Sequence, residues 1–478
     1  MATKRKKGKE NFGDWFRDIL DAAKIIDYRY PIKACGVWLP FGFKLRENVL
    51  RVIRRNLDET GHEEMLFPTL IPEDLIVKES THIKSFEGEA YWITHGGNNE
   101  LSVKLALRPT SETAITPMVK LWVRSHADLP LLLYQIGSIF RYETKATKPL
   151  IRIREVTTFK EAHTFHASHK ESKAQVKRAN EIYMKIFSEL CIPYVVNERP
   201  EWDRFAGALT TYAFDTIFPD GKCLQIGTSH DLGQNFAKAF DLTFEKKGGT
   251  RGLVWQTSYG ISERAIAAVI VVHGDDRGLV LPPKITPIQV VIVPILYKGF
   301  EDQILRVCRK VMSVLSEKDF RVVVDDRPKI TPGSKFYDWE LKGVPLRIEI
   351  GPRDLEAESF TLVRRDTAEK TVYKLDSLTR IGTILGEIED NLRTRAWKYM
   401  NDHIHKSETL EDAKKFLDTV GGIVEITWCG NDECGLRIEA EVETRVLGTT
   451  IDVDEELDGA CPCCGKKGKQ VIRVGRTY

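Results

Sequence analysis

Residues 130–168 read PLLLYQIGSIFRYETKATKPLIRIREVTTFKEAHTFHAS and contain two β-prone runs joined by a basic loop. The first run, Leu131 to Phe140, is apolar and has the composition of a strand buried in a sheet. The second run returns through Val156 to Phe159 and ends in charged residues and histidines. The loop carries the cations Lys145, Lys148, Arg152 and Arg154. The stretch therefore predicts two antiparallel strands with a cationic connection.

Arg141, Tyr142 and Glu143 follow the first strand directly. An arginine and a carboxylate at the end of a buried strand are costly unless another group pairs with them. Arginine offers a planar fork of donors and the loop adds positive charge, so the hairpin could seat a polyphosphate. The alternative is an ordinary sheet edge with a solvated basic loop, because structural ion pairs produce the same pattern.

Length and composition limit the class of protein. A chain of 478 residues, 42% hydrophobic and 29% charged, indicates a soluble globular protein of several domains. With a net charge of +2, contact with nucleic acid must come from local basic patches. No apolar run is long enough for a bilayer and no signal peptide is present, so we expect a cytoplasmic protein. Residues 1–10, MATKRKKGKE, predict a disordered basic tail, with attraction to RNA as the alternative.

The segment before the hairpin predicts helices and strands in alternation. Apolar residues recur at helical spacing over residues 12–26 and 45–57. Met65 to Leu70 predicts a strand that contains Pro68, and a proline inside a strand belongs at a sheet edge. Such an edge could pair with a second subunit, whereas a plain helix–strand unit is the alternative.

Thr110 and Glu112 follow another predicted strand, Leu101 to Leu107, where a helix begins. One interpretation is a helix N-cap with an acidic residue in the first turn. The other is a ligand site, in which Glu112 accepts hydrogen bonds from a substrate ammonium group. The two interpretations are compatible.

Polar side chains also mark the region after the hairpin. A helix is predicted over residues 170–190, and strands over residues 204–218 and 222–227. Gln225, Thr228 and His230 lie at the end of the second strand, where each could also be an ordinary turn or sheet residue. Arg264 opens the predicted helix of residues 265–273, and a cation in the first turn opposes the helix dipole. This placement indicates an anionic partner.

Pro282-Pro283 predicts a domain boundary, after which strands and helices alternate in the manner of an α/β domain. Strands are expected near residues 288–293, 321–324, 346–350 and 360–364, and a long helix follows. Polar residues near the middle of this domain, including Glu340, Arg347 and Arg353, form either a binding face or solvated surface.

Five cysteines lie near the end of the chain, in CGNDEC (residues 429–434) and CPCCG (residues 461–465). Two such knuckles in a reducing compartment predict a structural zinc site with tetrahedral thiolate ligands. We expect the ligands Cys429, Cys434, Cys461 and Cys463, with Cys464 as the alternative fourth ligand.

Taken together, these motifs resemble those of class II aminoacyl-tRNA synthetases. The helix and strand ending at Pro68 resemble the first motif of the class, Phe140 to Glu143 with the basic loop and Phe159 resemble the second, and Gly260 to Arg264 resemble the third. Arg108-Pro109-Thr110-Ser111-Glu112, the later α/β domain and the cysteine-rich end that closes on a tyrosine are similar to the prolyl-tRNA synthetase family of the archaeal and eukaryote-like type.

The resemblance implies roles for matching positions. The proline site would contain Thr110, Glu112, Arg141, Glu161, His163 and His230. The ATP site would contain Arg141, Glu143, Arg152, Ile153, Phe159, Gln225, Thr228, Ser262 and Arg264, with Arg141 and Arg264 as the catalytic cations. Glu340, Arg347 and Arg353 would read anticodon guanines. ATP with Mg²⁺, structural Zn²⁺, tRNA(Pro), L-proline and a second copy of the chain are the implied ligands and partners.

The resemblance also implies an architecture and a reaction. We expect a basic tail (1–10), an α+β catalytic domain of antiparallel sheet flanked by helices (11–283), an α/β anticodon-binding domain (284–402) and a small zinc-binding α/β domain (403–478). The reaction would be ATP-dependent activation of proline and its transfer to the 3′ end of tRNA(Pro). The stretch between Phe159 and Gly260 is short and reads as core, so we expect no editing domain and some misactivation of alanine or cysteine.

Other functions are compatible with parts of the chain. A threonyl enzyme would need a zinc site of one cysteine and two histidines in its amino-acid pocket, and Cys223 is the sole cysteine near the third-motif strands. A non-catalytic tRNA-binding paralogue should have lost Arg141, Glu143 or Arg264, and all are present. A zinc-ribbon scaffold does not explain the region before residue 280.

Overall fold

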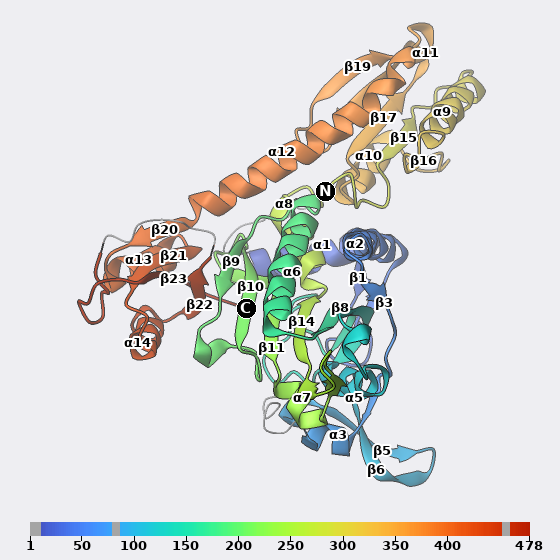
Figure 1. The fold of residues 1–478 in the computed structure, drawn as a ribbon. Helices are drawn as coiled ribbons and strands as arrows, with labels where there is room; N and C mark the ends of the chain where they lie inside the picture. The colour runs from blue at the N-terminus through green and yellow to red at the C-terminus, as the bar shows by residue number, and fades with distance from the viewer. Residues whose placement is uncertain (1–10, 79–86, 452–458) are drawn as a thin grey trace.

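The computed structural model describes residues 11–78, 87–451 and 459–478 (Figure 1). The predicted basic tail lies outside this range. The centre of the molecule is an 11-stranded sheet with the order β20-β21-β23-β22-β9-β10-β11-β14-β8-β7-β3. Its strands are β3 (Glu63–Glu64), β7 (Leu131–Phe140), β8 (Glu155–His166), β9 (Val195–Glu198), β10 (Thr210–Ile217), β11 (Cys223–Gly233), β14 (Trp255–Ile261), β20 (Ile404–Ser407), β21 (Ile423–Trp428), β22 (Arg445–Thr450) and β23 (Gln470–Gly475).

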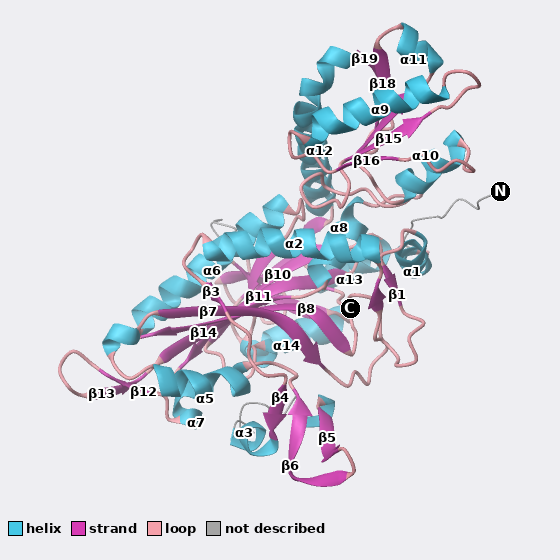
Figure 2. Cartoon of the chain, turned by 90° about the vertical axis from the view of Figure 1, so that its right-hand side faces the viewer, coloured by secondary structure: helices cyan, strands magenta, loops and turns pink. Residues whose placement is uncertain are grey.

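The predicted hairpin forms, with β7 and β8 paired in antiparallel register from Leu131↔Phe165 to Phe140↔Glu155. Strands β8, β14, β11, β10 and β9 then follow one another in antiparallel pairs, as predicted for the catalytic sheet. Four helices, α1 (Phe12–Ala22), α2 (Pro40–Asp58), α6 (His169–Glu189) and α8 (Arg264–His273), share one hydrophobic core with the sheet. Figure 2 shows α2 and α6 lying along the sheet. The opposite face of the central strands is therefore available for a site.

The strand predicted from Met65 to Leu70 is wrong. Pro68 lies between β3 and β4 (Leu70–Pro72), and β4 pairs instead with β6 (Asn99–Leu107) in a small sheet with β5 (Tyr91–Gly96). The backbone of this connection is bound by side chains: Phe67 N–H donates to Gln135 Oε1 at 3.2 Å, and Arg108 Nη1 donates to Phe67 O at 2.9 Å. A proline needs no partner for its nitrogen, so the segment can leave the ladder here.

The α/β domain is a separate five-stranded sheet with the order β16-β15-β17-β18-β19. Its elements are β15 (Val290–Pro294), α9 (Glu301–Ser316), β16 (Val322–Val324), α10 (Pro332–Leu341), β17 (Leu346–Ile350), α11 (Pro352–Glu356), β18 (Ser359–Arg364) and β19 (Lys370–Lys374). The four predicted strands are confirmed, each within two residues at either end. The long helix α12 (Ile381–Asp402) leads from this domain to the cysteine-rich end (Figure 1).

The C-terminal strands extend the central sheet. Strand β22 pairs with β9 through Thr449↔Glu198 and Thr450↔Asn197, while α13 (Leu410–Thr419) and α14 (Asp432–Val442) pack on β20 to β23. The catalytic strands and the cysteine-rich segment therefore share one hydrogen-bonded sheet. Among the described helices, none combines the length and apolar character that crossing a bilayer requires.

Candidate active site

A cavity of about 280 Å³ lies on the sheet face opposite the helices. Every residue predicted for proline or ATP lines it: Thr110, Glu112, Arg141, Glu143, Arg152, Ile153, Phe159, Glu161, His163, Gln225, Thr228, His230, Ser262 and Arg264. Strand alternation explains the placement on β8, since Phe159, Glu161 and His163 face the cavity while Lys160 and Ala162 face the helices. The structure thus assembles into one site residues that are up to 154 positions apart.

Three arginines give one part of the cavity a concentrated positive charge. Arg264 begins helix α8, and its Nε donates to Ile151 O at 3.0 Å. Burial and repulsion from Arg141 and Arg152 lower the pKa of Arg264 to about 10. Burial also lowers the pKa of Arg141, and the carboxylates of Glu161, Glu89 and Glu143 only partly oppose this shift. Because the cations repel one another in a desolvated site, an anionic ligand would be stabilised there.

The other part of the cavity is acidic and hydrogen-bonded. Burial and the neighbouring Glu112 raise the pKa of Glu161 to about 7. The Thr110 hydroxyl donates to Glu112, and Gln135 Nε2 donates to Glu161 Oε2 at 3.2 Å. Ser111 occupies the N-cap of α5 (Glu112–Trp122) and Glu112 lies in its first turn, as the N-cap interpretation predicts, but the Ser111 hydroxyl accepts a hydrogen bond from Gln135 and does not cap the helix.

Two buried histidines, His163 and His230, line the same part of the cavity as Glu112 and Glu161. His230 lies between two hydroxyls, with Nδ1 3.0 Å from Thr211 Oγ1 and Nε2 3.1 Å from Thr228 Oγ1. Burial and the nearby His163 lower the pKa of His230 to about 3, and burial lowers the pKa of His163 as well. Both imidazoles are therefore neutral at pH 7, and together with the Phe205 ring, 4.6 Å from His230, they offer a small and largely apolar wall.

Several lining residues were missed by sequence reasoning. Arg199, Asp203, Phe205, Thr211 and Ser258 all line the cavity. The sequence pattern indicated only weakly that Phe205 and Thr211 belong to the site, because strand β10 begins at Thr210 and not at residue 204 as predicted. Arg199 follows β9, a strand that the sequence analysis did not identify.

The last residue of the chain reaches the basic loop of the hairpin. Arg152 Nη2 donates to Tyr478 O at 2.8 Å, and the Lys148 ammonium lies 4.1 Å from the centre of the Tyr478 ring. The Tyr478 hydroxyl donates to Asp220 at 2.5 Å. The C-terminal segment is thus in contact with the basic loop that borders the cavity.

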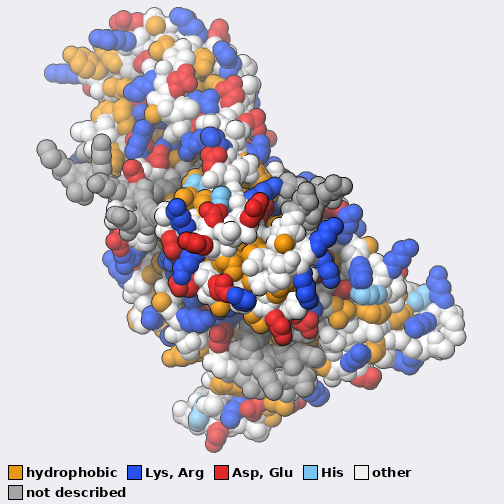
Figure 3. Space-filling model, turned by 90° about the vertical axis from the view of Figure 1, so that its left-hand side faces the viewer, with side chains coloured by type: hydrophobic (Ala, Val, Ile, Leu, Met, Phe, Trp, Pro, Cys, Tyr) orange, Lys and Arg blue, Asp and Glu red, His pale blue; other side chains and the backbone are white. Residues whose placement is uncertain are grey.

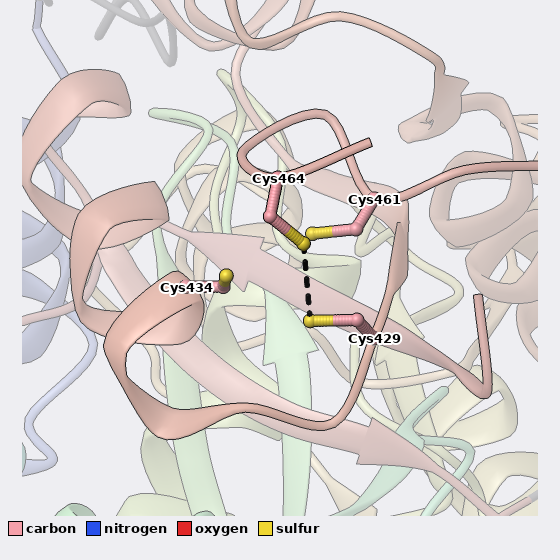
Figure 4. Close-up of side chains that lie close together, drawn as sticks. All are labelled: Cys429, Cys434, Cys461 and Cys464. Carbon is pink, nitrogen blue, oxygen red and sulfur yellow. Dashed lines mark hydrogen bonds between the residues drawn. The ribbon is translucent and has the colours of Figure 1, made fainter. Parts of the chain in front are cut away.

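Four cysteines converge near the C-terminus, and the predicted ligand set needs one correction. The sulfurs of Cys429, Cys434, Cys461 and Cys464 lie within 4.8 Å of one another (Figure 4). The structure brings the alternative fourth ligand, Cys464, into the cluster in place of Cys463, whose sulfur lies 3.6 Å from Cys434 O. A turn in which Gly465 N–H donates to Cys461 O at 2.8 Å brings Cys464 beside Cys461, with two residues between them. Four thiolates at this spacing suit tetrahedral Zn²⁺.

A second cavity, of about 250 Å³, lies in the α/β domain and is lined by Glu340 and Arg347. The Arg347 guanidinium lies over the Phe336 ring at 4.1 Å, and its Nε donates to Glu349 at 2.9 Å. Arg353, on α11, is not part of this lining. The sequence analysis expects Glu340, Arg347 and Arg353 in one binding face, and the structure places Glu340 and Arg347 together in the lining of this cavity.

Comparison with known proteins agrees with these sites. Residues 91–273 match the family model for the tRNA synthetase class II core domain (G, H, P, S and T), residues 289–381 the anticodon binding domain, and residues 410–478 the prolyl-tRNA synthetase C-terminal domain. Proline--tRNA ligases of Saccharolobus islandicus and Aeropyrum pernix are 52% and 51% identical, over 100% and 99% of both chains. The structure of Giardia lamblia prolyl-tRNA synthetase in complex with prolyl-adenylate matches with a TM-score of 0.97 at 35% identity, covering 100% of each chain. This chain therefore belongs to the prolyl-tRNA synthetase family of the class II aminoacyl-tRNA synthetases.

Proposed function

We propose that this protein activates L-proline with ATP to form prolyl-adenylate, and then transfers proline to the 3′ end of tRNA(Pro), releasing AMP and pyrophosphate. The observation that carries the proposal is the single cavity whose cationic part suits a triphosphate and whose acidic part suits an amino acid. A carboxylate and a triphosphate bound side by side are the two reactants of this activation.

Activation requires a proline carboxylate oxygen to attack the α-phosphorus of ATP as pyrophosphate leaves. Positioning and positive charge supply most of the catalysis in such a step. Arg141 lies at the end of β7, next to Glu161 and Glu143. We assign it to the carboxylate and the α-phosphate, Arg152 to the outer phosphates, and Arg264 with Phe159 to the two faces of adenine. The remaining ATP residues, Glu143, Ile153, Gln225, Thr228 and Ser262, would contact the nucleotide.

The proline ring needs a small apolar site with acceptors for its ammonium group. Glu112 and Thr110, joined by a hydrogen bond, are the proposed acceptors. Neutral His163 and His230, together with Phe205, would enclose the ring, and Glu161 would balance the charge of Arg141. Mg²⁺ would be carried by the triphosphate, whose hard oxygens it prefers. Zn²⁺ at the four cysteines would hold the C-terminal segment together.

The tRNA would be recognised by the α/β domain. We propose that Glu340 and Arg347 read anticodon guanines in the 250 Å³ cavity, and that Arg353 contacts the RNA outside it. On the face of the molecule in Figure 3, acidic and basic side chains are interspersed, in keeping with a net charge of +2. Recognition would therefore depend on local groups and not on a general basic field.

The proposed domains are the catalytic domain (11–283), the anticodon-binding domain (284–402) and the zinc-binding domain (403–478). Between β8 and β14 the chain forms α6, β9, β10 and β11, which belong to the central sheet and its helical layer, together with the short elements α7 (Asn235–Phe240), β12 (Thr243–Glu245) and β13 (Arg251–Leu253). We propose that no editing domain is inserted between these strands. All nine cysteines are unpaired, which supports a reducing, cytoplasmic setting.

Amino-acid-dependent ATP–pyrophosphate exchange across all twenty amino acids tests the function. We expect proline to give by far the highest kcat/KM, with measurable exchange for alanine and cysteine. A small apolar pocket discriminates against one missing methylene by only about 1–3 kcal/mol. A higher rate with threonine or glycine would refute the pocket assignment, and silence with both alanine and cysteine at saturation would refute the misactivation.

A homodimer is proposed from an exposed apolar surface beside the first-motif segment, defined by Leu66, Leu70, Met118, Leu121 and Trp122. Leu66 is 78% and Leu121 61% exposed, and the two segments adjoin, since the rings of Phe67 and Trp122 are 6.1 Å apart. An apolar surface of this kind marks an interaction site.

Leu66→Glu and Leu121→Glu are expected to convert a dimer into a monomer, because each would bury a carboxylate in the interface. Analytical ultracentrifugation of both variants at micromolar concentration measures this change. Val372→Glu is the matched control, since Val372 is 66% exposed on β19, in the five-stranded sheet of the α/β domain. A wild-type monomer, or variants that sediment as the wild type, would contradict the proposal.

A further inference from the structure

A row of hydrogen-bonded polar side chains crosses the central sheet from the cysteine-rich segment to the cavity, and all of its members are buried except the half-buried Gln225. Its members, in spatial order, are Glu425, Arg473, Asn197, Asp215, Arg199 and Gln225. The successive hydrogen bonds measure 3.0, 3.3, 3.0, 3.0 and 3.1 Å. Strand β21, which carries the first member, ends next to Cys429, and strand β11 carries the last. The proposed function uses only the final residue of this row.

Arg199 is the centre of the row on the catalytic side. Its Nη2 donates to both oxygens of Asp215, at 3.0 and 3.2 Å, and to Gln225 Oε1 at 3.1 Å. Its Nη1 donates to Leu447 O, on β22, at 2.5 Å. Arg199 is 6% and Asp215 1% exposed, so the pair is held in place away from water. A planar guanidinium can make these contacts together, whereas an ammonium group cannot.

The contact fixes how Gln225 meets a ligand. A glutamine amide has one acceptor atom and one donor atom. Because Arg199 donates to Oε1, the orientation of the amide is set, and its donor atom Nε2 is directed away from Arg199 and can be offered to a ligand in the cavity. A donor whose position is fixed before the ligand binds suits the oxygens of a nucleotide. It also avoids the free-energy cost of ordering a flexible side chain on binding.

We infer that Arg199 is a positioning residue for ATP: it orients the amide of Gln225 and ties that orientation to β22 of the C-terminal segment through Leu447. This inference rests on the proposed function. It adds one positioning residue, Arg199, and a connection from the C-terminal segment to the nucleotide site. The cysteine-rich segment supports nucleotide binding through the sheet, separately from the contact between Tyr478 and Arg152.

The test measures KM for ATP and KM for proline separately in pyrophosphate exchange. Arg199→Lys keeps the charge beside Asp215 but loses the fork, so KM for ATP should rise about tenfold, as for one or two lost hydrogen bonds, with KM for proline unchanged. The double variant with Gln225→Ala should be no worse for ATP than Gln225→Ala alone. Arg321→Lys is the matched control, since Arg321 is a half-buried arginine bound to the carbonyls of Thr286 and Pro283, outside both cavities.

A second pair of variants leaves Arg199 intact. Gln225→Glu keeps an acceptor for Arg199 but presents no donor, whereas Gln225→Leu removes both. Both should weaken ATP binding, and only Gln225→Leu should lower the Tm. Equal rises in both KM values for Arg199→Lys, additive effects in the double variant, or equal Tm losses for Gln225→Glu and Gln225→Leu would overturn the inference. Wild-type protein without proline-dependent exchange would instead refute the proposed function.

Discussion

Replacing Arg141 with alanine is expected to lower kcat/KM for proline-dependent pyrophosphate exchange by about 10²–10³-fold, the usual cost of removing one group that stabilises the transition state. Arg141 lines the cavity at the end of β7 and interacts electrostatically with Glu161, Glu143 and Glu112. No lysine replaces this charge in the described lining of the cavity. The measurement is steady-state exchange at varied ATP and proline, and both kcat and kcat/KM should fall.

Arg154→Ala is the matched control for this experiment. Arg154 belongs to the same loop, but its guanidinium lies 4.3 Å over the Tyr142 ring and it does not line the cavity. Its exchange activity should remain close to that of the wild type. If Arg141→Ala and Arg154→Ala lost activity equally, the loop as a whole would supply the positive charge, and the specific role of Arg141 would be refuted.

The second large effect is expected at the cysteine cluster. Cys464→Ser should abolish stoichiometric zinc binding and lower the Tm strongly, because a structural zinc site contributes its binding free energy to folding. The loss should reach the catalytic sheet, since β22 of this segment pairs with β9. Zinc content by mass spectrometry and thermal unfolding, with and without a chelator, measure both consequences.

Cys463→Ser is the matched control, because Cys463 is adjacent in sequence and its sulfur is not one of the four clustered sulfurs but lies against the backbone carbonyl of Cys434. It should retain one zinc ion per chain and a nearly unchanged Tm. The opposite pattern, with zinc lost in Cys463→Ser and kept in Cys464→Ser, would show that the ligand set first expected from the sequence is correct.

Much of the candidate site was predictable because its motifs resemble those of a known family, and strand periodicity and chemistry agree with the positions that the resemblance implies. The run from Leu131 to Phe140 is too apolar for a surface strand, and Arg141 directly after it needed an anionic partner. Alternation then placed Phe159, Glu161 and His163 on one face of β8. The gathering of these residues in one cavity agrees with the prediction.

The errors have local physical causes. The apolar composition around Pro68 predicts a strand, but Gln135 and Arg108 bind that backbone from distant positions. The sequence does not distinguish Cys463 from Cys464 as the fourth ligand, because the turn from Cys461 to Gly465 decides which sulfur faces the cluster. The resemblance groups Arg353 with Glu340 and Arg347, and the structure places Arg353 on α11, outside the cavity that the other two line.

By itself, the sequence predicted the antiparallel hairpin and its basic loop from periodicity and residue type, the family from the resemblance of its motifs, and a candidate thiolate metal site from its clustered cysteines. Only the tertiary structure decided that β22 pairs with β9 to make one sheet of two predicted domains, and that Arg199 joins Leu447 to Gln225. Such contacts join residues hundreds of positions apart. Strands pair through backbone N–H and C=O groups, which almost every residue carries. The residue types of a strand therefore do not reveal which other strand it pairs with.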